Sequence, residues 1–597
     1  LFVISLDTQQ QWFRYHHMFQ KLLLYRIHDL RSPEDIAGLH TRASAWFAEQ
    51  GLIDEALHYA LKGGDTAAAM QLVAQHRHDL IDQEQWSRLE RWLDLLPHDS
   101  IEEDPELLMA QAWYLWNRMR WPEMADALDR VEALVAACPT QSATARKLLG
   151  EIDCLRGVQW YIGAPCDGHR ALDHAQKAVQ RIPSQRRTAR SLALIVLAMS
   201  YQMTGDLNRA HSVVAEALKE RQILRSTLHT RMLAALCYIS WIEADLSNLR
   251  HTADQLLQLG NALDLPESIV HGRYFRGVGH YCRNELAEAE RSLAAVVRDA
   301  HVVNVDNFAH SCIALALTYQ AQGRHAEARE VTELIVSRAL ATGNTPFLHL
   351  TQAFQAELAL RQGHIAAVSY WAKNFDPDSL YAPFRFYVPQ LTLAKWLLAQ
   401  RSTESLMRAG ALLSRLHDFY LSIHNRRFLL EVLLLHALLQ DAQGDEQAAL
   451  STLADALALA EPGGFLRPFV DVGPHMASLV HKLMHHHTAI SYSGKILAAF
   501  RDEELRTGPH TSQHPIEPSS SLSSRPLIEN LTHRELEILN LLAQRFSNQE
   551  IGEKLFIAKM TVKKHTARIY VKLNVHNRRE AVAKARALGI LSHEESP

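Results

Sequence analysis

A small or polar turn residue recurs at nearly constant intervals through most of this chain. Successive turns lie 39, 40, 39, 40 and 81 positions apart, and the last gap is about two periods. The turn residues are Gly205, Ala244, Asn284, Gly323, Gly363 and Gly444. Each one separates a helix rich in large apolar residues from a helix with small residues at four-residue spacing. A period near 40 with two helices per unit predicts a repeat array rather than a helical bundle without a period.

The array predicts an all-α fold over residues 41–505. This stretch is rich in Ala, Leu, Gln, Arg and Glu, and strand-like alternation is scarce. A two-helix unit cannot bury its apolar face alone, so neighbouring units stack into a tetratricopeptide-like superhelix with a concave inner surface. We expect this superhelix to be a sensor domain that binds an effector or a partner protein.

Length and composition exclude several classes of protein. A chain of 597 residues is too long for one hydrophobic core. Its six cysteines are scattered without a CxxC pair, which suits reduced thiols in a cytoplasm rather than a disulfide framework or a zinc site. No apolar run approaches the roughly 20 residues that cross a bilayer, and the opening lacks the basic segment of a secretory signal. We therefore expect a cytoplasmic protein that does not contact a membrane.

Three helix-start signals follow one another near the C-terminus. The pairs Thr532–Glu535 and Ser547–Glu550 have the spacing of a reciprocal capping box, and Asn577 is a suitable N-cap. A further helix, at about 559–573, lies between the last two starts. Because only a few residues separate it from the helix before it, the two form a helix-turn-helix at about 549–570, in a domain of four short helices.

The third of these helices has a basic outer face. The residues off its apolar stripe, or at its start, are Lys559, Lys563, Lys564, Ala567 and Arg568. In a helix-turn-helix this helix enters the major groove, where lysine bonds guanine or phosphate and alanine contacts a thymine methyl. Residues 527–591 carry twelve Lys and Arg against six Asp and Glu, a net charge of +6 in a chain of −4, so the remainder is −10. This concentration predicts binding to double-stranded DNA; the alternative is a solvated basic helix.

Four short motifs run through the same segment: LTHRE at 531–535, SNQEI at 547–551, TVKKH at 561–565 and KLNVHNR at 572–578. In order and spacing they resemble the C-terminal DNA-binding domain of the LuxR family of transcription regulators. The resemblance implies that Lys563, Lys564 and Ala567 read bases. It implies that Ser547, Thr561 and Lys572 contact the DNA backbone, and that Val562 and Ile569 belong to the core. Arg545 and Ala558 depart from the Gly and the Ser or Thr common in the family, and the missing cap at Ala558 costs about 1 kcal/mol of helix stability.

Two further stretches resemble one group within that family. The opening segment at 7–30 and the sequence AEPGGFLRPFVDVG at 460–473 resemble the large ATP-dependent, MalT-like regulators, in which an ATPase module and a winged-helix segment precede the repeats. The resemblance implies the tail of a winged-helix segment at 1–40. Ser and Pro dominate residues 506–526, which predicts a flexible linker. The DNA-binding domain then occupies residues 527–597.

The ATPase module of that group has no counterpart here. No G-x-x-x-x-G-K-[ST] loop occurs, and the Gly494–Lys495 pair is followed by Ile496 and has Ala489 at the first glycine position. Because the phosphate-cradling loop needs its glycines and its hydroxyl, we expect no ATP hydrolysis and no cofactor in this chain. ATP is expected only if an ATPase is encoded upstream. The chain also begins without Met, so we expect the C-terminal part of a longer regulator or a truncated product.

No cluster in the sequence supports catalysis or metal binding. His481 and His485 lie one helical turn apart, but no Cys or well-placed carboxylate completes a metal shell. We find no Ser-His-Asp, Cys-His or paired-carboxylate arrangement either. We therefore expect no catalytic residue, no metal and no enzyme activity.

Two functions are consistent with these patterns. In the first, the chain is a transcription regulator, by analogy an activator, and a small-molecule inducer or a regulatory protein on the repeats controls the LuxR-type domain. Self-association would then multiply a weak affinity for DNA. In the second, the repeats are a protein-interaction scaffold and the DNA-binding domain is vestigial or only localises the protein.

Overall fold

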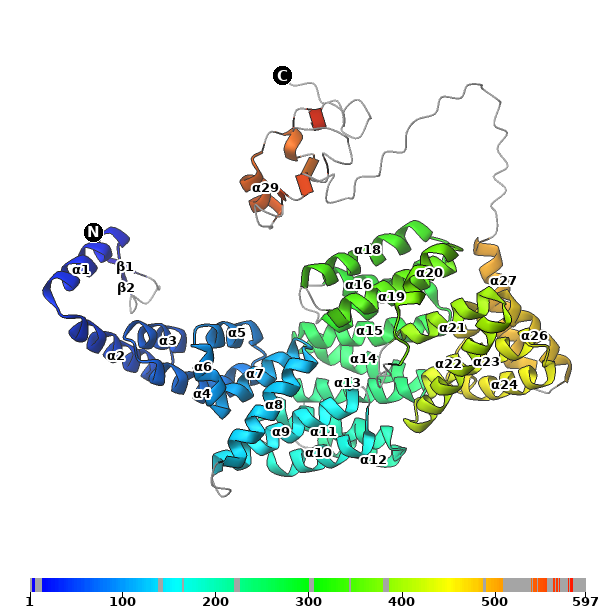
Figure 1. The fold of residues 1–597 in the computed structure, drawn as a ribbon, viewed down its shortest axis with the longest axis horizontal. Helices are drawn as coiled ribbons and strands as arrows, with labels where there is room; N and C mark the ends of the chain where they lie inside the picture. Colours follow the sequence, from blue (N-terminus) through cyan, green and yellow to red (C-terminus); the bar gives the residue numbers. More distant parts are fainter. Residues whose placement is uncertain are drawn as a thin grey trace. The chain divides into compact units, whose positions relative to one another are not determined.

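The computed structural model divides into two compact units, Leu1–Pro509 and His510–Pro597 (Figure 1). In the first unit it describes residues 3–5, 13–137, 143–163, 166–219, 226–299, 305–342, 345–378, 386–486 and 490–507. In the second it describes residues 538–539, 541–544, 546–555, 562–563, 565–566, 569, 578 and 580–582. The predicted linker therefore lies outside the described residues from position 508 onward.

The first unit opens with a small hairpin that the all-α prediction did not include. Its two strands pair antiparallel, with Val3 opposite Tyr15 and Ser5 opposite Phe13. Helices α1 to α10 follow the two strands. The elements are β1 (Val3–Ser5), β2 (Phe13–Tyr15), α1 (His17–Leu30), α2 (Pro33–Glu49), α3 (Ile53–Lys62), α4 (Thr66–Asp82), α5 (Trp86–Asp94), α6 (His98–Glu103), α7 (Pro105–Asn117), α8 (Trp121–Ala137), α9 (Ala143–Ile162) and α10 (Gly168–Arg181).

From α11 onward the helices come in pairs of nearly constant length. The pairs and the closing helices are α11 (Arg187–Met203), α12 (Leu207–Lys219), α13 (Thr227–Ile242), α14 (Leu246–Ala262), α15 (Pro266–Cys282), α16 (Leu286–Arg298), α17 (Val305–Ala321), α18 (His325–Thr342), α19 (Thr345–Arg361), α20 (Ile365–Asn374), α21 (Pro389–Gln400), α22 (Thr403–Ser422), α23 (Arg426–Ala442), α24 (Glu446–Ala460), α25 (Arg467–Asp471), α26 (Pro474–His486) and α27 (Ile490–Thr507). The predicted two-helix repeat is confirmed.

All the predicted turn residues adopt the left-handed backbone conformation. Their φ values are +84° at Gly205, +60° at Ala244, +63° at Asn284, +77° at Gly323, +81° at Gly363 and +87° at Gly444. After each of them, the next amide donates to a carbonyl five residues back, as from Asp206 to Tyr201 at 2.9 Å, which ends the first helix in a Schellman motif. Arg401, with φ of +53°, makes the turn inside the double gap.

The two helices of a pair differ in how much surface they bury. The first helix of each pair packs against the first helix of the next pair as well as against its own partner. α15 accordingly buries side chains around most of its circumference, including Phe275, Val278 and Tyr281. α16 buries one stripe at helical spacing, from Leu286 to Val296. A helix apolar all round sits in a core, and one with a single stripe lies at the surface, so the first helices form the inner layer.

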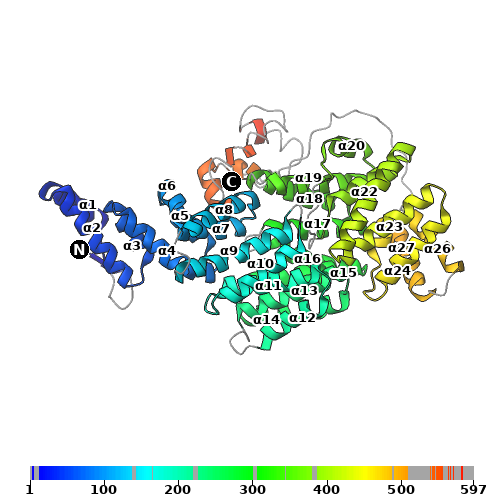
Figure 2. The same cartoon turned by 60° about the horizontal axis from the view of Figure 1, so that its bottom comes forward.

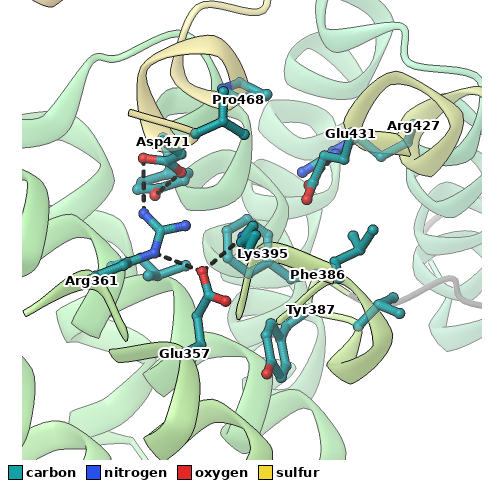
Figure 3. A pocket seen from close by; sticks show the side chains of 14 residues that line it. Glu357, Arg361, Phe386, Tyr387, Lys395, Arg427, Glu431, Pro468 and Asp471 are labelled. Carbon is teal, nitrogen blue, oxygen red and sulfur yellow. Dashed lines mark hydrogen bonds and ion pairs between the residues drawn. The ribbon is translucent and has the colours of Figure 1, made fainter. Parts of the chain in front are cut away.

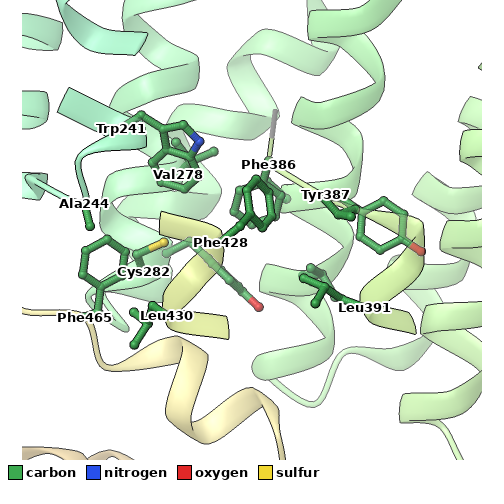
Figure 4. Close-up of a cluster of buried hydrophobic side chains, with 14 of the residues drawn as sticks. Trp241, Ala244, Val278, Cys282, Phe386, Tyr387, Leu391, Phe428, Leu430 and Phe465 are labelled. Atoms are coloured by element: carbon green, nitrogen blue, oxygen red, sulfur yellow. The ribbon is translucent and has the colours of Figure 1, made fainter. Parts of the chain in front are cut away.

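Helices of the inner layer that are far apart in sequence also contact one another or the end of the array. α13 contacts α23, and both helices are labelled in Figures 1 and 2. α15 contacts α25. Trp241, Cys282, Phe428 and Phe465 come from these distant segments and are buried together (Figure 4). The side-chain amide of Gln202 donates to the carbonyl of His424 at 3.1 Å, 222 positions away. At these contacts the chain itself covers the inner surface of the array.

The second unit has a small core of its own. Its buried side chains are Ile538, Leu539, Leu542, Ile551, Val562, Ile569 and Ala581. α29 (Asn548–Leu555) is the helix before the predicted turn. The predicted helix starts at Thr532 and Asn577, and most of residues 556–577, lie outside the described residues.

Candidate nucleic-acid interface and interior cavity

The start of α29 carries the predicted capping box. The backbone N–H of Ser547 donates to Oε2 of Glu550 at 2.7 Å, and the N–H of Glu550 donates to Oγ of Ser547 at 3.3 Å. Two backbone donors at the helix start are thereby satisfied reciprocally. Ser547 itself is exposed, and because its Oγ acts as an acceptor in the cap, its O–H is available to donate to another group.

The next helix places one exposed lysine beside its buried stripe. Val562 and Ile569 are fully buried, as predicted, and Thr566 lies between them on the same stripe. The Thr566 hydroxyl donates to the Val562 carbonyl at 2.9 Å. Lys563 is exposed, because its position is about 100° around the helix from that of Val562. An exposed ammonium on a helix held from behind by apolar contacts is suited to meet an anionic surface.

The remaining candidate DNA contacts stay predictions. They lie outside the described residues and are Lys559, Thr561, Lys564, Ala567, Arg568 and Lys572. Ser547 and Lys563 are thus the two candidates that the structure describes, and both are exposed.

Arg578 has a role that the sequence did not reveal. Its Nε and Nη2 donate to the carbonyl of Leu542 at 3.1 and 2.6 Å. A guanidinium at this position satisfies a backbone carbonyl in another segment of the domain and neutralises its partial charge. A sequence shows the cation but not the carbonyl that it meets, so Arg578 counted only as part of the basic charge.

A cavity of about 40 Å³ lies among the inner helices of the repeat unit (Figure 3). Tyr281, Phe386 and Tyr387 line it together with six charged residues. The charged residues are Glu357, Arg361, Lys395, Arg427, Glu431 and Asp471. The volume suits a few groups the size of water, so a larger ligand would have to displace side chains.

Glu357 is the acceptor on one side of this cavity. It accepts hydrogen bonds from Nε of Arg361 at 2.7 Å, Nζ of Lys395 at 2.8 Å and the hydroxyl of Thr392 at 2.7 Å. Burial by itself raises the pKa of the Glu357 carboxyl, but the charges of Lys395 and Arg361 lower it to about 2. Glu357 is therefore ionised and fully satisfied at neutral pH.

Asp471 is the acceptor on the other side. It accepts hydrogen bonds from Nε of Arg467 and from the Tyr281 hydroxyl, both at 2.6 Å, and it forms an ion pair with Nη1 of Arg361 at 3.1 Å. Burial opposes ionisation, but Arg361 and Arg467 hold the pKa of Asp471 below its ordinary value. Arg361 thus bridges the two buried carboxylates, as Figure 3 shows.

Arg427 differs from the other cations of the cavity. Its guanidinium carbon lies 4.8 Å from the ring centre of Trp241, and Nη1 lies 2.6 Å from Oε1 of Glu431 on the same helix. Among the described residues, neither Nε nor Nη1 has a partner in hydrogen-bond geometry. Arg427 is buried and is paired within its own helix and stacked on an aromatic ring, whereas Arg361 joins carboxylates from two different helices.

His481 and His485 are both exposed on α26. Within the described ranges, no group of three His, Cys, Asp or Glu side chains is arranged to hold a metal ion. The same ranges contain no helix that is both long and apolar enough to cross a bilayer.

Comparison with known families covers both units. The family described as MalT-like TPR region matches residues 150–486, the MalT winged helix domain matches residues 1–36, and the bacterial regulatory proteins of the luxR family match residues 529–585. None of these families is an ATPase module.

Similarity to solved structures is at low identity and low TM-score. Yeast Tom70 is 12% identical with a TM-score of 0.34, over 80% of this chain and 98% of that chain. A Rap protein in complex with competence and sporulation factor is 10% identical with a TM-score of 0.37, over 68% of this chain and 99% of that chain.

The first of the family matches spans more than half of the chain, and the luxR match coincides with the described capping box and the exposed Lys563. This chain belongs to the MalT-like family and, with its LuxR-family domain, is a DNA-binding transcription regulator.

Proposed function

We propose that this regulator is an activator whose repeat unit controls its DNA-binding domain. An inducer or a regulatory protein bound to the repeats would change self-association, and assembled copies would bind repeated sites in double-stranded DNA with multiplied affinity. The proposed domains are a winged-helix tail (1–40), a repeat sensor (41–505), a linker (506–526) and the DNA-binding domain (527–597).

The exposed position of Lys563, about 100° around the helix from the buried Val562, carries this proposal. The same face would present Lys564, Ala567 and Arg568, and a net charge of +6 over 527–591 supports binding to a polyanion. We assign base contacts to Lys563, Lys564 and Ala567 and backbone contacts to the other candidates. Those are Ser547, Lys559, Thr561, Arg568 and Lys572.

The interior cavity is the proposed place where the repeats respond to an effector. It combines three aromatic rings with three cations and three carboxylates. Pockets that combine apolar walls with a few directed polar groups are typical ligand sites. A bound effector would enlarge this cavity by moving the side chains that now fill it.

The test is enrichment of the full chain on a pool of randomised duplexes at two salt concentrations. Lys563→Ala with Lys564→Ala should abolish enrichment, because each base-reading residue contributes about 1–3 kcal/mol, and should weaken binding at least tenfold. The control replaces two exposed lysines of the repeat unit, Lys373→Ala with Lys495→Ala, which changes the net charge equally. If all three proteins enrich the same sequences with equal affinity, the DNA-binding assignment is wrong and the scaffold hypothesis gains.

A further inference from the structure

Residues 461–473, here named the closing segment, bring the end of the repeat array onto its earlier turns. The N–H of Leu466 donates to the carbonyl of Cys282 at 2.9 Å. A Cβ atom added at Gly463 would lie 2.5 Å from the carbonyl oxygen of Ala244, so only glycine fits against that turn without a shift. Phe465 is fully buried (Figure 4). The closing segment therefore fastens two parts of the array that are far apart in sequence.

Arg467 is the centre of this contact. Its side chain is 3% exposed. It donates to Oδ1 of Asp471 at 2.6 Å, to Oδ1 of Asn284 at 3.2 Å, and to both carboxylate oxygens of Glu503 at 2.8 and 2.5 Å. Burial disfavours the charged form, yet these carboxylates raise the pKa of Arg467. One guanidinium thus joins an early turn, the closing segment and α27.

Helix α27 is bonded to the closing segment at a second point. The hydroxyl of Tyr492, near the start of α27, donates to the carbonyl of Phe465. The ring of Tyr492 also meets Phe469 edge-on at 6.4 Å. The contacts at Tyr492 and Glu503 lie eleven residues apart, so the closing segment holds α27 along about three turns. The described part of this helix ends at Thr507, where the predicted linker follows.

The same network reaches the interior cavity. Asp471, which binds Arg467, also accepts from Tyr281 and Arg361, and Arg361 continues to Glu357. A buried ion network tolerates the loss of one member poorly, since each remaining charge is left without compensation. Such a network favours two states, fully formed or fully open, over intermediate ones.

We propose that the closing segment and α27 open and close as one unit. Separation of the two ends of the array breaks the Arg467 network and releases α27, the helix from which the chain continues toward the DNA-binding domain. A ligand that enlarges the cavity and withdraws Arg361 from Asp471 drives this opening. The link from opening to DNA binding rests on the proposed function, whereas the joint opening rests on the contacts alone.

Hydrogen exchange measured by mass spectrometry on the full chain tests the joint opening. Gly463→Ala pushes the closing segment away from Ala244, and the nearest neighbours of the added Cβ are Ala244 and Phe465, which lie outside α27. Its expected effect is at least tenfold faster exchange both in the closing segment and in α27. The control is Gly279→Ala on α15, where an added Cβ meets only an ordinary contact at 3.7 Å. Faster exchange confined to the closing segment in Gly463→Ala would overturn the proposal.

A second variant changes the Arg467 network on the side of α27. Glu503→Gln weakens the pair with Arg467 and should speed exchange in α27, in the closing segment and in the turn at 283–285. Its control is Glu446→Gln, which breaks an exposed pair with Lys482 at 2.5 Å and should leave all three regions unchanged. Glu503→Gln also tests the joint opening if Gly463→Ala fails to fold. Faster exchange limited to α27 would show that α27 opens independently of the closing segment, which would overturn the proposal.

The DNA affinity of the same four variants distinguishes the joint opening of the closing segment and α27 from its role in the control of DNA binding. If Gly463→Ala and Glu503→Gln free α27 and also change affinity for the enriched duplex, both the joint opening and its role in control are supported. If they free α27 while affinity stays at the wild-type value, the joint opening stands and control through α27 fails. Loss of enrichment in Lys563→Ala with Lys564→Ala is independent of both results.

Discussion

The two units of this protein place their charges in opposite ways. In the repeat unit, Glu151, Glu357 and Asp471 are buried, and each is held by arginine or lysine from another helix. In the described part of the DNA-binding unit, Lys563 and Glu550 are exposed, and the half-buried Arg578 donates to a backbone carbonyl. Buried ion pairs thus join helices of the first unit, whereas in the described part of the second unit Lys563 and Glu550 face outward.

This difference explains why one unit reveals its function in its sequence and the other does not. An exposed cation off the apolar stripe of a helix can be recognised from helical periodicity alone. A buried cation such as Arg467 looks the same in a sequence, since its meaning depends on partners that only the fold brings close. The comparison yields predictions in which each variant affects one unit and leaves the other unchanged.

The largest effect is expected at Arg77. It donates to Glu106 at 2.5 Å and to Glu151 at 2.8 and 3.0 Å, and its side chain is buried. Arg77→Met leaves the buried Glu151 without its main counter-ion, which costs about 3–5 kcal/mol. All eleven tryptophans of the chain precede residue 510, so their fluorescence during urea unfolding reports on the repeat unit.

The matched control is Arg130→Met. Arg130 forms a 2.5 Å pair with Glu102, but both side chains are about half exposed, and such pairs contribute about 0–1 kcal/mol. Exchange in α29, which belongs to the other unit, should stay unchanged in both variants. Equal destabilisation by the two substitutions, or faster exchange in α29, would contradict the contrast between the units.

A smaller effect, dependent on pH, is expected at Glu357. The pKa of this carboxyl is lowered from an ordinary 4.5 to about 2. A group whose pKa is lowered on folding contributes stability that is present above its unfolded pKa and is lost as the pH falls toward the folded value. Glu357→Gln should therefore cost about 2–3 kcal/mol at pH 7, and the deficit should shrink between pH 4.5 and pH 2.

Urea midpoints from tryptophan fluorescence at pH 7, 5, 4 and 3 test this dependence. Glu404→Gln serves as the control, because Glu404 is exposed in the first turn of α22. A difference between wild type and Glu357→Gln that stays constant from pH 7 to pH 3 would show that the Glu357 carboxylate is not the stabilising form.

Local features of the fold were predictable, and features that depend on curvature were not. The turns at Gly205 and Asn284 were found because a left-handed residue that ends a helix is a property of a few neighbouring residues. Arg401 also has a positive φ between two helices, but arginine is not a typical turn residue, so the sequence showed only a double gap. The capping box of Ser547 and Glu550 was likewise local, and it is confirmed.

The contact of the closing segment with Cys282 and Asn284 could not be predicted in this way. It spans 183 positions between Arg467 and Asn284, and whether the two meet depends on the rotation that accumulates over several stacked pairs. The sequence at 460–473 was noticed through its family resemblance, which gave no role to Arg467. The interior cavity was missed for the same reason, since its lining comes from helices α15 to α25.

The smallest effect is expected at the cap of α29, and it separates two roles of Ser547. Ser547→Ala and Glu550→Ala each remove one half of the capping box, so each should cost about 1 kcal/mol in local stability, measured as faster exchange in α29. Only Ser547→Ala also removes the hydroxyl that we assign to the DNA backbone. Its affinity for the enriched duplex should therefore fall further than that of Glu550→Ala, because losing Glu550 makes the unit more positive and favours DNA binding.

A neutral hydroxyl releases no counter-ion, so the salt dependence of DNA binding by Ser547→Ala should match that of wild type, unlike that of the lysine variants. If the two cap variants bind DNA equally, Ser547 acts only as the cap of α29 and its assignment as a DNA contact is wrong.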